Sequence, residues 1–195
     1  MSGFTIIGTG NMGGAITALA ERGGVPVQNV AHGDDVDAFT GDVVVLAVPY
    51  EALGEVAAQF TDQLAGKIVV DITNPVDLPE GRRREIKAGS AAAELSTRLP
   101  QSRVLKAFNT TFAATLASGE LAADGAPPVP VTVLVAGDDA DAKAALIDAV
   151  DASGAQGIDV GPLARAEELE ATGYLQLSLA MGDVVPWTGG FTLVR

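Results

Sequence analysis

The sequence predicts an α/β fold with a doubly wound, mostly parallel sheet and helices on both of its faces. Short apolar segments alternate along the chain with segments whose apolar residues recur at helical spacing. Several apolar segments, such as residues 42–49 (DVVVLAVP), are almost continuous in valine and leucine, which is typical of strands covered on both faces. A glycine-rich turn also joins the first strand to the first helix, as in a tightly connected βαβ unit.

Each element follows from its local pattern. The first strand is expected at residues 4–7 and the first helix at residues 11–22, where two glycines end it. Further strands are expected at residues 25–31, 42–49, 67–72, 103–108, 129–137 and 157–161. Further helices are expected at residues 51–60, 82–88, 90–99, 138–152 and 165–181, followed by an extended tail. Because only about ten residues separate the second strand from the third, the second crossover is predicted to be shortened to a bare loop.

The chain of 195 residues is expected to form a single domain. Residues 1–75 form its first βαβ half, residues 103–162 its second half, and residues 163–195 a C-terminal helix and tail. Hydrophobic residues make up 48% of the chain and aromatic residues 5%, so the core is expected to consist mainly of small aliphatic side chains.

The composition excludes several classes of partner and site. A net charge of −13 repels nucleic acid and anionic membrane surfaces, so we expect neither as a partner. The absence of cysteine excludes disulfides, thiolate nucleophiles and cysteine-based metal sites, and no metal site is expected. No apolar run approaches the ~20 residues that span a bilayer, and the N-terminus has no signal-peptide pattern. The sequence therefore predicts a cytoplasmic protein.

The glycine-rich turn has the spacing G-x-G-x-x-G, formed by Gly8, Gly10 and Gly13. Gly8 allows the tight turn, Gly10 lets a pyrophosphate approach the backbone, and Gly13 lets the helix pack closely on the strand. The N–H groups at the helix start attract an anion locally, even in an acidic protein. This setting indicates a Rossmann-type dinucleotide site; the alternative is a turn in which glycine serves packing alone.

The end of the second strand bears on the choice between NAD and NADP. NAD-binding proteins carry an acidic residue there, whereas NADP-binding proteins tend to carry a basic one. This chain has Ala31 and His32, followed by Asp34. Either His32 donates to a 2′-phosphate, or Asp34 holds a ribose hydroxyl, or His32 is a surface residue with neither role. The residues leave both cofactors open.

Pro49, Asn74 and Asn109 each lie just past the end of a predicted strand. Ligands of open α/β sheets bind beyond the carboxyl ends of the strands, so we expect these residues to converge at a cleft. Each also has a structural explanation: Pro49 ends a strand, Asn74 makes a turn before Pro75, and Asn109 caps a helix that starts near residue 111. Their shared position favours the ligand site.

Blocks spread over nearly the whole chain resemble the NADP oxidoreductases that depend on coenzyme F420, a 5-deazaflavin. The blocks are IIGTGNMGGAI, VVVLAVPYEAL, VVDITNPVD, SAAAEL, VLKAFNTTFA, VLVAGDDADAK, IDVGPLARAEELE and WTGGF. The series DITNP, KAFNT and GPLARAEELE is the most specific part of the resemblance. The chain is also similar to the N-terminal domain of the STEAP ferric reductases; it lacks their membrane half, so haem-linked iron reduction is not expected.

The resemblance implies hydride transfer between NADP(H) and F420 or a flavin-like second cofactor, in a homodimer. For the pyrophosphate it implies contacts with Gly8, Thr9, Gly10, Asn11, Met12 and Gly13. For the nicotinamide ribose it implies Val48, Pro49 and Tyr50, and for the cleft where the rings meet it implies Asn74, Pro75, Asn109 and Thr110. Family members that bind NADP commonly carry Ser-Arg where this chain has Ala31-His32, so NAD use stays open.

Direct transfer between two bound rings needs alignment rather than a side-chain base, so no residue is assigned a certain catalytic role. Glu167, Glu168 and Glu170 are expected on a solvated face of the last helix. The arginines at 82–84 are expected on a solvated helix face, with the anionic tail of a deazaflavin as the alternative partner. Two other functions stay open: a non-catalytic NAD(P)-binding module, and an NAD(P)-dependent dehydrogenase of a small organic substrate. The dehydrogenase is disfavoured because no Lys, His or Tyr is obviously placed as a proton donor at the cleft, with Lys106 and Tyr50 as the remaining candidates.

Overall fold

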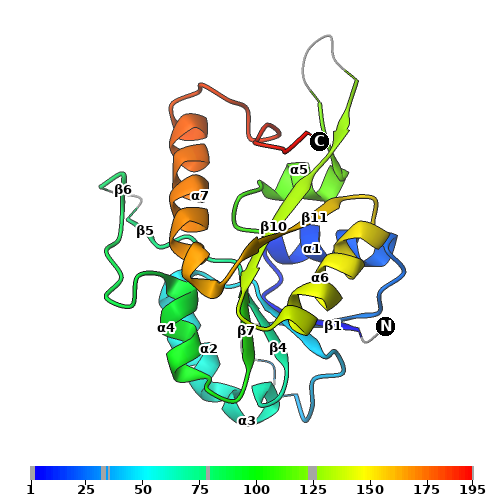
Figure 1. Cartoon of the computed structure of the whole chain (residues 1–195), viewed down its shortest axis with the longest axis vertical. Coiled ribbons are helices and arrows are strands. Elements are labelled where there is room, and N and C mark those ends of the chain that lie inside the picture. The colour runs from blue at the N-terminus through cyan, green and yellow to red at the C-terminus, as the bar shows by residue number, and fades with distance from the viewer. Residues whose placement is uncertain (1–2, 32–33, 35, 78–79, 123–126, 195) are drawn as a thin grey trace.

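The computed structural model describes residues 3–31, 34, 36–77, 80–122 and 127–194. Its centre is a seven-stranded sheet in the order β11-β10-β7-β4-β3-β1-β2 (Figure 1). The strands are β1 (Phe4–Ile7), β2 (Val27–Val30), β3 (Val43–Leu46), β4 (Ile68–Asp71), β7 (Arg103–Lys106), β10 (Thr132–Gly137) and β11 (Gln156–Gly161).

The five strands β2, β1, β3, β4 and β7 run parallel to one another. The strand β10 pairs antiparallel with β7, and β11 pairs parallel with β10. The sheet is therefore mostly parallel, which confirms the predicted fold class. Because β2 and β3 lie on opposite sides of β1, the strand order reverses there, and such a switch point opens a crevice at the carboxyl ends of the strands.

Helices cover both faces of the sheet (Figure 1). The helices are α1 (Asn11–Arg22), α2 (Tyr50–Gln59), α3 (Thr61–Leu64), α4 (Ala91–Arg98), α5 (Ala113–Ser118), α6 (Ala140–Ala152), the 3-10 turn η1 (Leu163–Arg165) and α7 (Ala166–Met181). Ile6 of β1 and Val45 of β3 belong to one buried cluster, with residues of α1, α5 and α6. Their neighbours in the same strands, Ile7 and Val44, belong to a second cluster, with residues of α2 and α4. This alternation is what a strand buried on both faces produces.

The predicted helix at residues 82–88 is wrong. Arg82–Arg83 forms a short strand, β6, that pairs antiparallel with β5 (Val76–Asp77). Gly81 lies at φ +60°, in the left-handed region that a tight turn uses, and the turn lets the chain pair back on itself. The predicted helix at residues 90–99 is confirmed as α4, and the Ser90 side chain accepts a hydrogen bond from the Ala93 N–H (3.1 Å).

Two further boundaries differ from expectation. The strand predicted at residues 129–137 is interrupted at Val131: β9 (Val129–Pro130) pairs with β8 (Glu120–Leu121), and only β10 joins the main sheet. The helix expected at residues 138–152 begins two residues later, at Ala140. Its cap is Asp139, which accepts from the Ala142 N–H, while Asp138 accepts from the Leu163 N–H. The described part of the second crossover, between β2 and β3, contains no helix, as predicted from its length.

The helix α7 stands beside the sheet, and the chain then turns back toward α5 and β10 (Figure 1). The tail is held there by hydrogen bonds from the Thr115 hydroxyl to the Gly189 carbonyl (2.9 Å) and between the Thr132 and Thr192 hydroxyls (2.8 Å). Among the residues that the structure describes, no helix has both the length and the apolar character needed to cross a membrane.

Candidate functional site

The glycine-rich turn follows β1 and begins α1, as predicted, and its three glycines have different structural reasons. Gly8 has a φ of +112°, and a Cβ there would lie 2.2 Å from the carbonyl oxygen of Ala47. A Cβ on Gly13 would lie 2.0 Å from the carbonyl oxygen of Gly8. A Cβ on Gly10 would meet no atom within 4 Å. Packing therefore explains Gly8 and Gly13, but it does not explain Gly10.

The space beside Gly10 fits a pyrophosphate. Gly10 is the N-cap of α1 and offers no side chain to the first N–H groups of the helix, which have no acceptor within the helix. The first turn of α1 contains no acidic residue, and Thr9 and Asn11 are exposed on either side of Gly10. A bound anion would satisfy these N–H groups and would interact favourably with the helix dipole.

The end of β3 lies against this turn, because the Ala47 N–H donates to the carbonyl of Ile7 (2.8 Å). Pro49 is the N-cap of α2, and Val48 is half-buried against the α2 side of the core. The Tyr50 hydroxyl, by contrast, donates to the Glu94 carboxylate (2.9 Å), and burial together with this carboxylate raises the pKa of Tyr50 to about 12. Its hydroxyl group is thus held at α4, in a pocket that shares no residue with the cleft described next.

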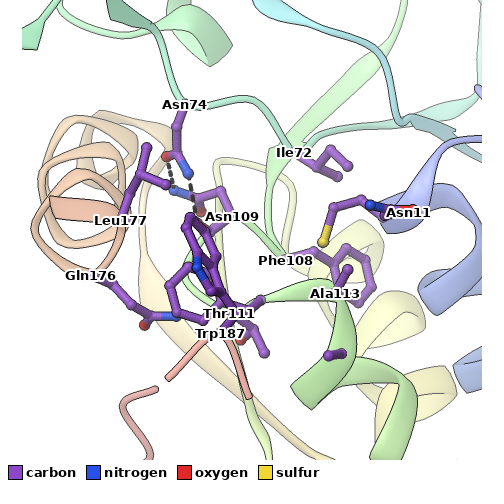
Figure 2. Close-up of a pocket in the computed structure, with 14 residues that line it drawn as sticks. Asn11, Ile72, Asn74, Phe108, Asn109, Thr111, Ala113, Gln176, Leu177 and Trp187 are labelled. Atoms are coloured by element: carbon purple, nitrogen blue, oxygen red, sulfur yellow. Dashed lines mark hydrogen bonds between the residues drawn. The ribbon is translucent and has the colours of Figure 1, made fainter. Parts of the chain in front are cut away.

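A cleft of about 440 Å³ lies at the carboxyl ends of β4 and β7. Figure 2 shows Asn11 on one side of it and Gln176 and Leu177 of α7 on the other. The residues that line the cleft include Asn11, Met12, Ile72, Asn74, Phe108, Asn109, Gly173, Gln176, Leu177 and Trp187. The cleft therefore begins at the glycine-rich turn and extends to α7 and the tail.

Asn74 and Asn109, both predicted to line the cleft, do so as a hydrogen-bonded pair (Figure 2). The Asn74 Nδ2 donates to the Asn109 carbonyl (2.8 Å), and the Asn109 Nδ2 donates to the Asn74 Oδ1 and to the Leu169 carbonyl (both 2.9 Å). The backbone just before this pair is strained, since Phe108 has a φ of +62°. Asn109 does not cap a helix: α5 begins at Ala113 and has no side-chain cap.

The other two residues predicted for the cleft, Pro75 and Thr110, lie elsewhere. Pro75 is buried, and its carbonyl accepts from the Arg84 N–H of the hairpin (2.9 Å). Thr110 lines a separate small cavity beside Leu193. The two asparagines thus face the cleft, whereas their sequence neighbours support the backbone around it.

Gly173 of α7 is a feature of the site that the sequence reasoning missed. A Cβ at this position would lie 2.6 Å from both terminal atoms of the Asn74 amide and 2.7 Å from the carbonyl oxygen of Asn109. The asparagine pair therefore packs directly on the backbone of α7, and only glycine leaves room for it. The signal was present: Ala166, Leu169 and Gly173 form one buried stripe at helical spacing.

Glu170 lies on the same stripe, and the prediction that it is solvated is wrong, because its side chain is 1% exposed. Its Oε1 accepts from the Lys106 Nζ (2.8 Å) and from the Ala91 N–H (2.9 Å). The same ammonium group donates to the Asp71 Oδ2 (2.9 Å) and to the Thr73 carbonyl (2.5 Å). Burial raises the pKa of the Glu170 carboxyl, and the charge of Lys106 opposes that shift. Lys106 itself is fully buried and does not line the cleft.

Two further regions lie near the site, the end of β2 and the C-terminal tail. At the end of β2 the Ala31 N–H donates to the Asp34 carboxylate (2.7 Å), while His32 lies outside the described residues. Trp187 packs against Phe112 with ring centroids 5.0 Å apart, at the edge of the cleft. No group of described residues has the composition of a metal site.

Several known proteins are similar in sequence to this chain. A family profile described as NADP oxidoreductase, coenzyme F420-dependent, matches residues 16–75. The F420-dependent NADP reductase of Methanocaldococcus jannaschii is 35% identical over 144 residues, which are 71% of this chain and 62% of that protein. The F420-dependent NADP reductase of Methanothermobacter thermautotrophicus is 31% identical over 173 residues, which are 84% of this chain and 70% of that protein.

Two further proteins are also similar to this chain. The rat metalloreductase STEAP3 is 35% identical over 130 residues, which are 67% of this chain and 24% of that protein. The chain thus spans less than two thirds of the Methanocaldococcus reductase and about a quarter of STEAP3. A crystal structure from Arthrobacter sp. FB24, described as a candidate F420-dependent NADP reductase, superposes over 100% of both chains with a TM-score of 0.80 and 24% identity, which shows the shared fold. On the strength of these relatives, and as its sequence blocks predicted, the chain belongs to the family of coenzyme F420-dependent NADP oxidoreductases.

Proposed function

We propose that the protein is an oxidoreductase that transfers hydride between NADP(H) and coenzyme F420, or a flavin-like second cofactor. The observation that carries the proposal is the continuity of the cleft from Asn11 and Met12, at the dinucleotide turn, to Gln176 and Leu177 on α7. A nicotinamide that extends from a pyrophosphate at Gly10 would leave the α7 side of the cleft for a second ring. The names of the archaeal relatives support the same pair of cofactors.

The residues of the chain bind and orient rather than react. The backbone N–H groups from Gly8 to Gly13 would hold the pyrophosphate, and Val48 and Pro49 lie at the neighbouring strand end. When both cofactors are bound, the reduced ring supplies a hydride and the other ring accepts it, with one proton exchanged with water. Ile72, Phe108 and Leu177 line the cleft with apolar surface, which excludes water from that transfer.

The asparagine pair gives the cleft a rigid polar wall. Because Asn74 and Asn109 bind each other and the α7 backbone, neither side chain is free to rotate as ligands enter. Fixed dipoles of this kind align a ring at little entropic cost. The two asparagines are therefore positioning groups, and no described residue is assigned as a general base.

We also propose that the protein acts as a homodimer in the cytoplasm. Large apolar side chains on α7 and the tail are exposed in the single chain, which supports an interface there. These side chains are Leu175, Met181, Val184, Trp187, Phe191, Leu193 and Val194. Sedimentation analysis tests the dimer, and a Leu175→Glu variant should shift it toward monomer if this surface is the interface.

The proposed activity is tested by titrating the protein with NADPH and then adding F420 in a stopped-flow instrument. We expect the absorbance of reduced nicotinamide to fall only when F420 is present. A flavin and a set of small oxo acids serve as alternative acceptors. Tight NADPH binding without turnover on a deazaflavin or flavin would contradict the proposal and would favour a binding module.

A further inference from the structure

The Gln176 side chain is buried in the cleft wall, and among the described residues its carbonyl oxygen lacks the hydrogen bond that a buried acceptor requires. The residue is 2% exposed and lines the cleft, and the structure gives its Oε1 no hydrogen-bond partner among the described residues. Figure 2 shows the side chain reaching from α7 toward Thr111, beside Trp187. A buried carbonyl without a partner costs about 1–3 kcal/mol, so a residue whose role was packing alone would be better served by leucine.

The residues around Gln176 hold its side chain in place but supply no hydrogen-bond donor to its Oε1 among the described residues. The tail closes over the amide, since a Cβ on Gly190 would lie 3.5 Å from the Nε2 and 3.7 Å from the Oε1. Gly173 lies one turn earlier on the same face of α7 and supports the Asn74 amide. Rotation of the terminal carboxamide exchanges its carbonyl and NH₂ ends, so the group can present either one to the cleft.

A carboxamide of this kind matches one particular ligand chemistry. Its carbonyl accepts from an N–H while its NH₂ donates to an adjacent carbonyl, and the imide edge of a pyrimidinedione offers both side by side. Deazaflavins and flavins carry that edge. A nicotinamide carries a primary amide that could also pair with Gln176, but the dinucleotide turn lies on the opposite wall, at Asn11 and Met12.

We propose that Gln176 is the specificity-determining residue for the second ring, and that it hydrogen-bonds the imide edge of the pyrimidinedione. This inference rests on the proposed function and assigns a residue to it. Gln176 contacts the ring at its edge, away from the carbon that exchanges hydride, so it sets affinity and orientation. An acceptor ring without the imide N–H loses this contact.

The test compares 5-deazariboflavin with its N3-methyl derivative, in which the imide N–H is blocked. Dissociation constants are measured by fluorescence quenching for the wild type, for Gln176→Leu and for the exposed-residue control Gln101→Leu. In the wild type and the control, methylation should weaken binding about tenfold, the effect of losing one hydrogen bond in a closed site. Gln176→Leu should bind the parent ring about tenfold more weakly and should discriminate less than about twofold between the two rings.

Two internal readouts distinguish the possible failures. NADPH affinity and the unfolding temperature of Gln176→Leu should not fall, because the substitution removes an unsatisfied polar group. Full discrimination between the two rings by Gln176→Leu would overturn the inference while leaving the proposed function intact. A loss of affinity in Gln176→Leu that is confined to NADPH would also overturn the inference, because Gln176 would then bind the nicotinamide. If the wild type binds neither ring while NADPH still binds, the proposed function itself fails.

Discussion

The Lys106 ammonium group lies 2.8 Å from the Glu170 carboxylate, and both side chains are enclosed, at 0% and 1% exposure. This pair joins the end of β7 to α7, and Asp71 at the end of β4 completes it (2.9 Å). Gly173 and Gln176 follow Glu170 on the next turns of the same helix. The ion pair therefore determines how the cleft-lining face of α7 lies against the sheet.

Lys106→Met should destabilise the protein strongly, because it leaves two buried carboxylates without their cation. We expect a loss of about 3–5 kcal/mol in the free energy of unfolding, measured by urea denaturation. Glu170→Gln keeps an acceptor for Lys106 and for the Ala91 N–H, so its loss should be within about 1 kcal/mol. Glu168→Gln on the exposed face of α7 is the control and should change stability by less than about 0.5 kcal/mol. A loss in Lys106→Met no larger than the change in Glu168→Gln would contradict the buried pair.

The pH dependence of stability isolates the Glu170 carboxyl. Burial raises its pKa in the folded protein, so the folded state holds this proton more tightly than the unfolded chain does. The resulting stabilisation is complete below the unfolded pKa of about 4.3 and is lost as pH rises through the folded-state pKa. The unfolding free energy of the wild type, minus that of Glu170→Gln, should therefore decrease as pH rises from about 4. Arg98 lowers the pKa of Glu94, and Lys143 lowers the pKa of Asp159. Both carboxyl groups are present in the wild type and in the variant, so their contributions to the difference in unfolding free energy cancel. If this difference in unfolding free energy does not change with pH, the pKa of Glu170 is not raised in the folded protein.

Local pattern was enough to predict much of the fold. The strands β3 and β4 are continuous apolar runs, and the helix expected at residues 90–99 is α4. Glu170 was misassigned because its two neighbours, Glu167 and Glu168, made the segment look uniformly solvated. The helical spacing of the buried stripe would have separated Glu170 from them.

The site was only partly predictable for a related reason. The glycine turn is local, and so its position follows from spacing. Gly173, by contrast, is glycine because Asn74 and Asn109, from the loops after β4 and β7, pack on it. The hairpin at residues 82–83 depends on pairing with β5, which no local periodicity records. Long-range contacts of this kind are not visible in a single sequence.

Gly173→Ala should damage both stability and the cleft. Alanine is favoured over glycine by up to about 1 kcal/mol in a helix, but here its Cβ would lie 2.6 Å from the Asn74 amide. We expect a net loss of about 1–3 kcal/mol and weaker binding of the second ring. Gly54→Ala in α2 is the matched control, because its Cβ would lie 3.5 Å from the Arg98 guanidinium, an ordinary contact. That variant should gain up to about 1 kcal/mol, and a similar gain at position 173 would refute the proposed packing.

Substitution of the glycine turn should separate folding from binding. Gly10→Val has open space for its side chain, so the unfolding temperature should stay within about 2 °C while NADPH affinity falls at least about tenfold. Gly13→Ala would place a Cβ 2.0 Å from the Gly8 carbonyl oxygen and should destabilise the protein before any ligand is added. Thermal shift and calorimetric titration measure the two effects. Unchanged NADPH affinity in a folded Gly10→Val variant would remove the pyrophosphate from this turn.

The charge of the Asp34 carboxylate should weaken the binding of NADPH relative to NADH. It accepts from the Ala31 N–H (2.7 Å) at the end of β2, where the ribose of an adenosine half would lie, and its charge opposes a 2′-phosphate there. Asp34→Asn keeps a side-chain acceptor for the Ala31 N–H but removes the charge. The ratio of NADPH to NADH affinity should therefore rise about threefold to tenfold, and the rise should shrink at high salt because the group is exposed. Asp37→Asn, an exposed neighbour, controls for net charge. Equal rises in the two variants would show that Asp34 acts only through the overall field, and the adenosine ribose would then have to be placed elsewhere along β2.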